Sequence, residues 1–285
     1  MRKVLLATTA LVAMGGVTAA NADISISGNY EWEYESKDDG NTFSDDAHIV
    51  VKAVNAADNG MTFTATIGLN DGSFDYQHIK VTGDFGTVYL GDVDGNSAAS
   101  LMDGALGRNK DIETQVGLGD ADTLSTSGGH DIIYMTPKMG GFQIGLGTEL
   151  TDLDNTANDG ASDAALTYSI SGVNLFASAT SGSAIESSNF GVSTSIAGLN
   201  IGVGSRTEGG SSQGKSNDIG VNYTLSNGIK VAALAANGTA ANGTTKVKAT
   251  NFGLSYPVVP GVKLNAETGK VAGANYSWIA VNMSF

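Results

Sequence analysis

Apolar and polar residues alternate with a period of two in many short segments of this chain. The clearest example runs from 24 to 35. Its apolar face consists of Ile24, Ile26, Tyr30, Trp32 and Tyr34, and its polar face of Ser25, Ser27, Asn29, Glu31, Glu33 and Glu35. This period predicts a β-strand with one apolar face, longer than the usual strand of about five or six residues. A tilted strand that crosses a bilayer needs about 9–11 residues.

The same alternation recurs along the chain and reaches its last residue. It is found at 61–69, 165–170, 199–206, 218–225 and 262–267. In the final segment, Ile279, Val281, Met283 and Phe285 share one face, and Trp278, Ala280, Asn282 and Ser284 share the other. After residue 22, no stretch of the sequence is long and apolar enough to predict a membrane helix.

Turn-forming residues separate these segments. Tight turns rich in Gly, Asn and Asp are expected at 58–60, 83–86, 139–141, 171–172, 197–198, 226–228 and 257–261. More variable polar links are expected at 36–45, 70–73, 94–128, 151–161, 181–185, 208–215, 238–245 and 271–274. These connections predict an all-β fold: a transmembrane, antiparallel, up-and-down β-barrel of 16 strands with short turns on one rim. A soluble secreted β-sandwich or β-solenoid is the alternative.

The first residues have the pattern of a secretory signal peptide. Arg2 and Lys3 precede an apolar run at 4–14, and Ala20, Asn21 and Ala22 form a small-residue cleavage site. We therefore expect a cleaved leader at 1–22 and a barrel at 23–285. Because the leader holds two bases and no acid, its loss changes the formal charge from −14 to −16. Such a charge argues against nucleic acid as a partner and favours cations.

Three patches resemble a known family. They are 80–92 (KVTGDFGTVYLGD), 130–137 (HDIIYMTP) followed by Gly140, Gly141 and Phe142, and the terminal Phe285. Together they resemble the Gram-negative general diffusion porins, in particular the trimeric alphaproteobacterial and neisserial type. In architecture the resemblance extends over the whole mature chain.

The resemblance implies a homotrimer in the outer membrane, in contact with outer-membrane lipid, that forms a water-filled channel for passive diffusion of small hydrophilic solutes and ions. It also implies that the long third loop, 94–128, folds into the lumen and constricts it, and that Phe285 is the assembly signal. No cofactor is expected.

Charged residues give the candidate selectivity groups of such a pore. On the acidic side the constriction loop offers Asp94, Asp103, Asp111, Glu113, Asp120 and Asp122. On the basic side we expect Arg108, Lys52, Lys80 and Arg206. Acids outnumber bases in the loop, so the sequence predicts cation preference.

Further carboxylates and aromatic residues complete the prediction. Glu31, Glu33 and Glu35 suit a wet lumen, where they add to cation preference or bind Ca²⁺. The acidic loop residues Asp152, Asp154 and Asp159 are also candidate ligands for Ca²⁺, which would bridge to lipopolysaccharide.

Aromatic girdles at the two interfaces are expected from Tyr30, Trp32, Tyr34, Tyr89, Tyr256, Tyr276 and Phe285.

No enzyme motif supports catalysis, because G-x-S-x-G, H-E-x-x-H, the Walker loop and G-x-G-x-x-G are all absent from the sequence. We therefore do not expect an enzyme. Two alternatives to a general porin stay open: a substrate-selective outer-membrane channel, and a non-conducting structural or adhesive surface barrel.

Overall fold

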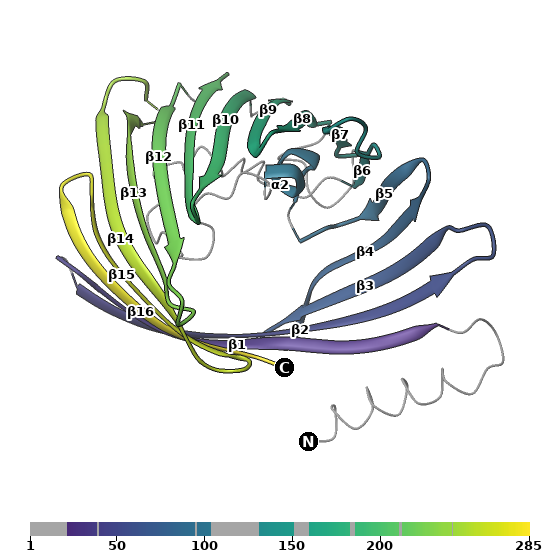
Figure 1. Cartoon of the computed structure of the whole chain (residues 1–285), viewed down its shortest axis with the longest axis horizontal. Helices are drawn as coiled ribbons and strands as arrows, with labels where there is room; N and C mark the ends of the chain where they lie inside the picture. The colour runs from purple at the N-terminus through teal and green to yellow at the C-terminus, as the bar shows by residue number, and fades with distance from the viewer. Residues whose placement is uncertain are drawn as a thin grey trace.

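Strands with one apolar face that cross a bilayer must pair every backbone N–H and C=O group, which a closed sheet achieves. The computed structural model of this chain has such a sheet. It describes residues 22–38, 40–94, 96–103, 131–150, 160–182, 186–210, 213–240 and 242–285. Within them, 16 antiparallel strands form a single closed barrel in which each strand pairs with its neighbours in sequence and β1 pairs with β16. The predicted fold class and strand number are therefore confirmed. Figure 1 shows the strands as a ring.

The strands have the following bounds: β1 Asp23–Lys37, β2 Gly40–Ala56, β3 Thr62–Asn70, β4 Ser73–Gly83, β5 Gly86–Gly91, β6 Ile132–Met135, β7 Phe142–Thr148, β8 Ser162–Ile170, β9 Val173–Ser181, β10 Glu186–Ile196, β11 Leu199–Gly209, β12 Lys215–Thr224, β13 Lys230–Thr239, β14 Lys246–Val259, β15 Val262–Val271 and β16 Ala274–Ser284. One short helix, α2 (Ala98–Asp103), follows β5. Among the described residues no helix is long and apolar enough to cross a bilayer.

The period-two pattern separates an apolar outer face from a polar inner one. Phe252 is 52% exposed on β14, whereas its neighbour Asn251 is 9% exposed. On β16, Ile279 is exposed and Trp278 is buried. Neighbouring strands keep the same inward and outward sets, because directly opposed residues lie on one face of the sheet. The outer face therefore offers apolar side chains to lipid, and the inner face lines the lumen.

The two rims differ in their connections. Connections after even-numbered strands form the short-turn rim, and those after odd-numbered strands form the long-loop rim, which includes the segment after β5. Ser171 (φ 50°) with Gly172 (φ 81°) is a two-residue turn of the kind that matches strand twist. In outer-membrane barrels the short turns face the periplasm and the longer loops the exterior.

Four of the predicted connections differ in the structure. The link expected at 36–45 is shorter, because β1 extends to Lys37 and β2 already begins at Gly40. Polar residues occupy both faces there, so the sequence period fades while the backbone pairing continues. The links at 70–73 and 271–274 are two-residue turns, in which Asp71 and Ala272 adopt positive φ before a glycine. The 257–261 turn is also shorter, since β14 continues to Val259 across an irregularity in its pairing with β15.

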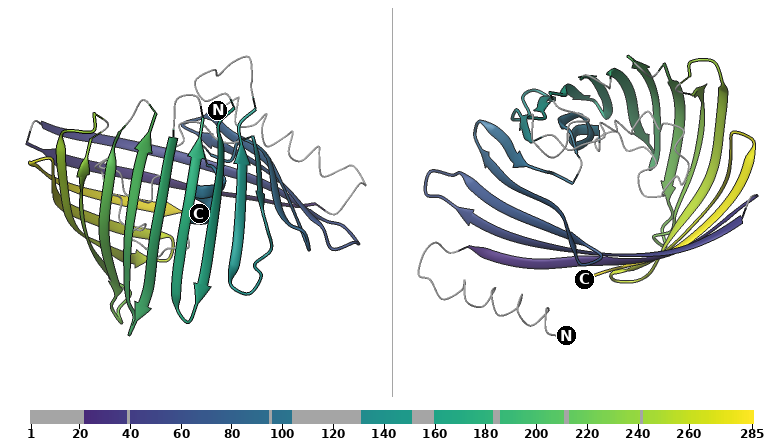
Figure 2. Two further views of the ribbon diagram at one scale, coloured as in Figure 1. Left: turned by 90° about the horizontal axis from the view of Figure 1, so that it is seen from above. Right: turned by 180° about the vertical axis from the view of Figure 1, so that it is seen from behind.

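Helix α2 lies inside the ring, next to β6–β9 (Figures 1 and 2). Its residues Ala99 and Met102 pack with Ala165 and Phe176 of the inner wall. A second cluster joins its first residue, Ala98, to Val93 and Ile133. Among the described residues, the helix and the segment before it thus pack on the wall through two buried apolar clusters, and a third, Leu234 with Ala236 and Ala249, lies on β13 and β14. The start of the predicted constriction loop therefore enters the lumen, as expected.

Candidate functional site

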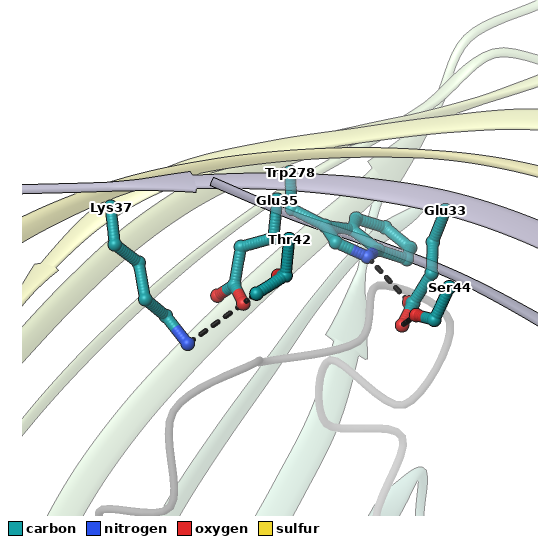
Figure 3. Close-up of polar contacts among 6 residues, drawn as sticks. All are labelled: Glu33, Glu35, Lys37, Thr42, Ser44 and Trp278. Carbon is teal, nitrogen blue, oxygen red and sulfur yellow. Dashed lines mark hydrogen bonds and ion pairs between the residues drawn. The ribbon is translucent and has the colours of Figure 1, made fainter. Parts of the chain in front are cut away.

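The polar face of β1 forms an acidic ladder in the lumen, made of Glu31, Glu33 and Glu35. Each of these residues is opposed by a strand on either side, β16 and β2. Trp278 Nε1 donates a 2.8 Å hydrogen bond to Glu33, and Ser44 Oγ donates one of 2.5 Å to the other oxygen of the same carboxylate. The close-up in Figure 3 shows both contacts.

The other two carboxylates of the ladder also have partners. Glu31 accepts a hydrogen bond from the side-chain amide of Asn282. Glu35 is buried, with Lys37 Nζ 2.7 Å from its carboxylate (Figure 3). Because Lys37 is much more exposed than Glu35, the ion pair lies at the lumen surface, where its contribution to stability is small.

A further carboxylate, Glu267 on β15, extends the acidic wall. It is 3% exposed and accepts hydrogen bonds from Tyr276 Oη and, at 3.1 Å, from Asn251 Nδ2. Its inward position follows from the alternation at 262–267, but sequence reasoning did not select it as a site residue. Tyr276 accordingly points into the lumen and does not belong to an aromatic girdle, contrary to expectation.

The basic candidates Lys52 and Lys80 lie on the inner faces of β2 and β4. Lys80 Nζ is 5.6 Å from the centre of the Tyr89 ring, a cation–π distance. Tyr89 therefore also points inward, and its predicted place in a girdle is wrong. Lys52 is opposite Thr66, which is opposite His78, so the basic groups of the two strands share one patch of wall.

Histidine and tyrosine rings alternate across this patch, which sequence reasoning did not find. Successive rings of His48, Tyr76, His78 and Tyr89 have centres 5.6, 6.0 and 5.6 Å apart. Three strands contribute to the row, and only their register brings these residues together. His48 Nε2 is in addition 3.9 Å from Asp75.

Arg206 occupies the inner face of β11 but does not act as an isolated cation. Its guanidinium is 2.6 Å from the carboxylate of Glu208 on the same strand. The side chain is almost fully buried, so most of its positive charge is compensated within the wall.

Asp94 starts the constriction loop, directly after β5, in a left-handed conformation (φ 55°) that Asp tolerates better than most residues. The side chain reaches solvent but is partly desolvated, and burial raises the pKa of its carboxyl above the ordinary value. The nearby Asp75 and Asp92 raise this pKa further, whereas His48 and His78 act in the opposite direction.

The helix that follows is held by side chains at its first turn. Ser97 and Ser100 cap it reciprocally, each side-chain oxygen accepting from the other's backbone N–H at 3.2 and 2.7 Å. Asp163 of β8 accepts a 2.6 Å hydrogen bond from the backbone N–H of Ala99. Sequence reasoning did not identify Asp163 as a site residue, because its partner Ala99 is 64 residues away along the chain.

The remaining candidates lie outside what the structure describes. Asp103 ends α2, but its side chain is outside the described part. Arg108, Asp111, Glu113, Asp120 and Asp122 lie beyond the described residues, as do the calcium candidates Asp152, Asp154 and Asp159. Among the described residues, no group of three or more His, Cys, Asp or Glu side chains could hold a metal ion.

Phe285 closes the barrel with Gly28. The backbones of the two residues exchange N–H···O hydrogen bonds of 3.0 Å in both directions. A Cβ at Gly28 would lie 2.7 Å from the Phe285 ring, so only glycine leaves room for that ring on β1. The aromatic side chain itself is 65% exposed on the outer face, at the short-turn rim.

Comparisons with known proteins agree with this architecture. A family model described as "Gram-negative porin" matches residues 7–276. A loop-deletion mutant of OmpT, an outer membrane protein of Vibrio cholerae, is 15% identical with a TM-score of 0.73, over 93% of this chain and 99% of that one. A triple mutant of the Rhodopseudomonas blastica porin is 16% identical with a TM-score of 0.73, over 92% of this chain and all of that one.

A search of curated proteins finds no match. The structural likenesses, at such low identity, bear on the fold alone, whereas the family model covers nearly the whole sequence. With the 16-strand barrel and its inward-folded helix, that match decides the family. The chain belongs to the Gram-negative porins and is an outer-membrane porin channel.

Proposed function

We propose that this porin admits small hydrophilic solutes and ions by passive diffusion, with a preference for cations. The single observation that carries the cation preference is the acidic wall of the lumen, formed by the ladder Glu31, Glu33 and Glu35 together with Glu267 on β15. These carboxylates lie on β1 and β15, the two strands that flank β16 at the closure of the barrel. Clustered carboxylates in a pore concentrate cations and repel anions.

Inward-facing lysines are unevenly distributed along the pore axis. Lys52, Lys80, Lys230 and Lys263 lie toward the short-turn rim, because they occur late in even-numbered strands or early in odd-numbered ones. Among the described residues, the inward-facing cations toward the long-loop rim, Lys37 and Arg206, lie beside the carboxylates of Glu35 and Glu208. Glu35 and Glu267 lie toward the long-loop rim. A cation that enters from the exterior would therefore meet negative potential first, while the lysines sit near the opposite mouth.

The positive side is weak compared with the acidic one. Arg206 is paired with Glu208, which leaves lysines and the histidine–tyrosine row as the basic elements of the described wall. We therefore propose modest cation selectivity and weak discrimination among solutes. The homotrimer and the absence of catalytic activity are part of the same proposal and rest on family membership.

Planar-bilayer recording of the refolded mature chain tests this proposal. The reversal potential in a salt gradient reports the sign of the selectivity, and insertion steps grouped in threes would support the trimer. We expect a cation-side reversal potential and conductance that rises linearly with salt. Saturation, or block by one solute class, would favour the substrate-selective channel. Verified folded protein that stays silent would favour the structural barrel.

A further inference from the structure

The histidine–tyrosine row crosses the inner wall of β2–β5, strands that lie side by side in Figure 1. Its members are His48, Tyr76, His78 and Tyr89. Tyr89 is opposite Lys80 toward the short-turn rim, whereas His48 is opposite Asn70, the last residue of β3, toward the long-loop rim. The row therefore extends along the pore axis, and a solute that passes this side of the lumen meets one ring after another.

Small residues in the wall leave room for these rings. The Tyr76 ring occupies the space over Gly68 of β3, where any Cβ would collide with its ring carbons. Gly91 is opposite His78 and adds no side chain on β5. All four rings of the row are half-buried. Because they belong to the inner face, part of each ring is in contact with the lumen.

His78, near the middle of the row, has a defined orientation. Its Nδ1 is 3.2 Å from the backbone carbonyl oxygen of Asp92. A carbonyl oxygen only accepts hydrogen bonds, so Nδ1 carries a proton and donates it. The planes of the His78 and Tyr76 rings differ by 14°. Since offset stacking is a preferred arrangement of aromatic rings, the same orientation of a planar solute is favourable at both.

Lysines flank one end of the row and an acid the other. Lys52 and Lys80 both interact electrostatically with His78. In the part of the chain that the structure describes, neither lysine forms an ion pair with a carboxylate. At the other end of the row, Asp75 is 3.9 Å from His48 Nε2. The positive charge that a solute can use is therefore at the end nearer the short-turn rim.

We propose that the histidine–tyrosine row and its two lysines bind solutes that combine a planar aromatic ring with a carboxylate. The carboxylate pairs with Lys52 and Lys80, and the aromatic ring stacks on His78 and Tyr76. The row occupies one sector of the wall, so the inference adds a preferred solute class to passive diffusion and does not require a closed pore. It rests on the water-filled lumen of the proposed function.

Equilibrium binding to the folded mature chain in detergent tests this inference, with saturation-transfer NMR as the readout and protein-free micelles as the blank. Benzoate is the probe. Cyclohexanecarboxylate has the same charge without the aromatic ring, and benzamide has the ring without the charge. We expect benzoate to bind about fivefold more tightly than cyclohexanecarboxylate. It should bind about tenfold more tightly than benzamide.

Ring variants test the stacking surface. Tyr76→Leu should remove the preference for benzoate over cyclohexanecarboxylate, whereas Tyr76→Phe, which keeps the ring, should retain it. Tyr223→Leu is the matched control, because Tyr223 lies on the outer face of β12. It should leave all three affinities unchanged. A native chain that does not distinguish the two carboxylates, or equal effects of Tyr76→Leu and Tyr223→Leu, would overturn the proposal.

Lysine variants test the charged end, and they serve if Tyr76→Leu does not fold. Lys52→Gln with Lys80→Gln should weaken benzoate binding about tenfold and leave benzamide binding unchanged. Lys230→Gln with Lys263→Gln is the matched pair, since these lumen lysines lie toward the same rim on β13 and β15. That pair should bind benzoate as the native chain does. Equal losses in the two pairs would mean that only the total charge of the lumen matters, and would overturn the assigned site.

Binding is measured without conduction, so this inference and the proposed function can fail separately. A cation-preferring channel whose folded form does not bind benzoate above the micelle blank would overturn this inference alone. Selective benzoate binding in a channel with an anion-side reversal potential would support this inference and contradict the proposed cation preference.

Discussion

The carboxylate of Asp163 on β8 holds the backbone N–H of Ala99 at 2.6 Å and so ties helix α2 to the inner wall. A helix of six residues is too short to persist by its own hydrogen bonds, so this contact and the apolar packing of Met102 must position it. The position of the start of the constriction loop thus depends on Asp163, a residue that follows the loop in the sequence.

Asp163→Ala should loosen α2, because it leaves a buried N–H without its charged acceptor, at a cost of about 1.5–3 kcal/mol. The barrel itself should remain folded, since strand pairing closes it. We expect higher single-channel conductance and noisier open-channel current in bilayer recordings. Asp163→Asn is the matched control, because its amide oxygen still accepts a hydrogen bond while the charge is lost. Identical traces from the native and Ala channels would contradict this role.

Gly145 offers an independent test of the same helix position. A Cβ at Gly145 would lie 2.4 Å from Met102 Sδ and 3.2 Å from the Cβ of Ala98. Gly145→Val should therefore displace α2 from β7 and change conductance in a folded channel. In the double variant with Met102→Ala, which removes the colliding side chain, conductance should return toward the native value. Lack of any such recovery would argue against direct packing.

The acidic ladder should set most of the cation preference. A single charge about 10 Å from a permeating ion in water contributes about 0.4 kcal/mol, or a factor of about two in relative permeability. Glu33→Gln with Glu35→Gln should therefore lower the cation-to-anion permeability ratio about fourfold. Asp45→Asn is the control, because Asp45 faces outward and bonds Tyr30. Equal shifts from the ladder and control variants would contradict a lumen role.

Most of the fold could be predicted from the sequence, because each strand has one apolar face and one polar face. The face assignments of Glu31, Trp32 and Trp278 follow directly from parity, and so does the inward position of Lys52. For Lys80 the parity is poorly resolved in the sequence, and the strand register places the residue inward. The error at Tyr276 arises because residue type was put before parity: Tyr276 has the same parity as Trp278 on β16 and therefore faces the lumen, although aromatic residues are typical of interface girdles.

The contacts of the candidate functional site could be predicted only in part. Contacts within one strand or across a tight hairpin, such as Arg206 with Glu208, lie close in sequence. The row of His48, Tyr76, His78 and Tyr89, however, depends on the register of three strands, and the Asp163 contact with α2 on how a loop returns to the wall. Neither leaves a periodic trace in the sequence.

Closure of the barrel should depend on the fit of Phe285 against Gly28. Gly28→Val would force a side chain into the carbonyl oxygen of His48, 2.6 Å from the Cβ position, and into the Phe285 ring. We expect a marked loss of folded, heat-modifiable protein in electrophoresis after refolding. Phe285→Ala should reduce the folded fraction less, and Phe285→Trp, which keeps an aromatic ring, least. Normal refolding of Gly28→Val would show that the strand ends tolerate rearrangement.

Acidification should weaken the cation preference in a way that depends on Asp94. Because burial raises the pKa of its carboxyl, Asp94 takes up its proton at a higher pH than an ordinary aspartate, whose pKa is about 3.9. Lowering the pH from 7 toward 4 should thus remove a negative charge at the start of the constriction loop.

Loss of this negative charge lowers the local concentration of cations at the start of the constriction loop, so the cation-to-anion permeability ratio should fall. Asp94→Asn should start with a lower cation-to-anion permeability ratio at pH 7 and should show a smaller pH response than the native chain, because it lacks the titrating carboxyl. Reversal potentials measured at half-unit pH steps would compare the two profiles. A pH profile in Asp94→Asn with the native amplitude would mean that this carboxyl does not face the permeating ions.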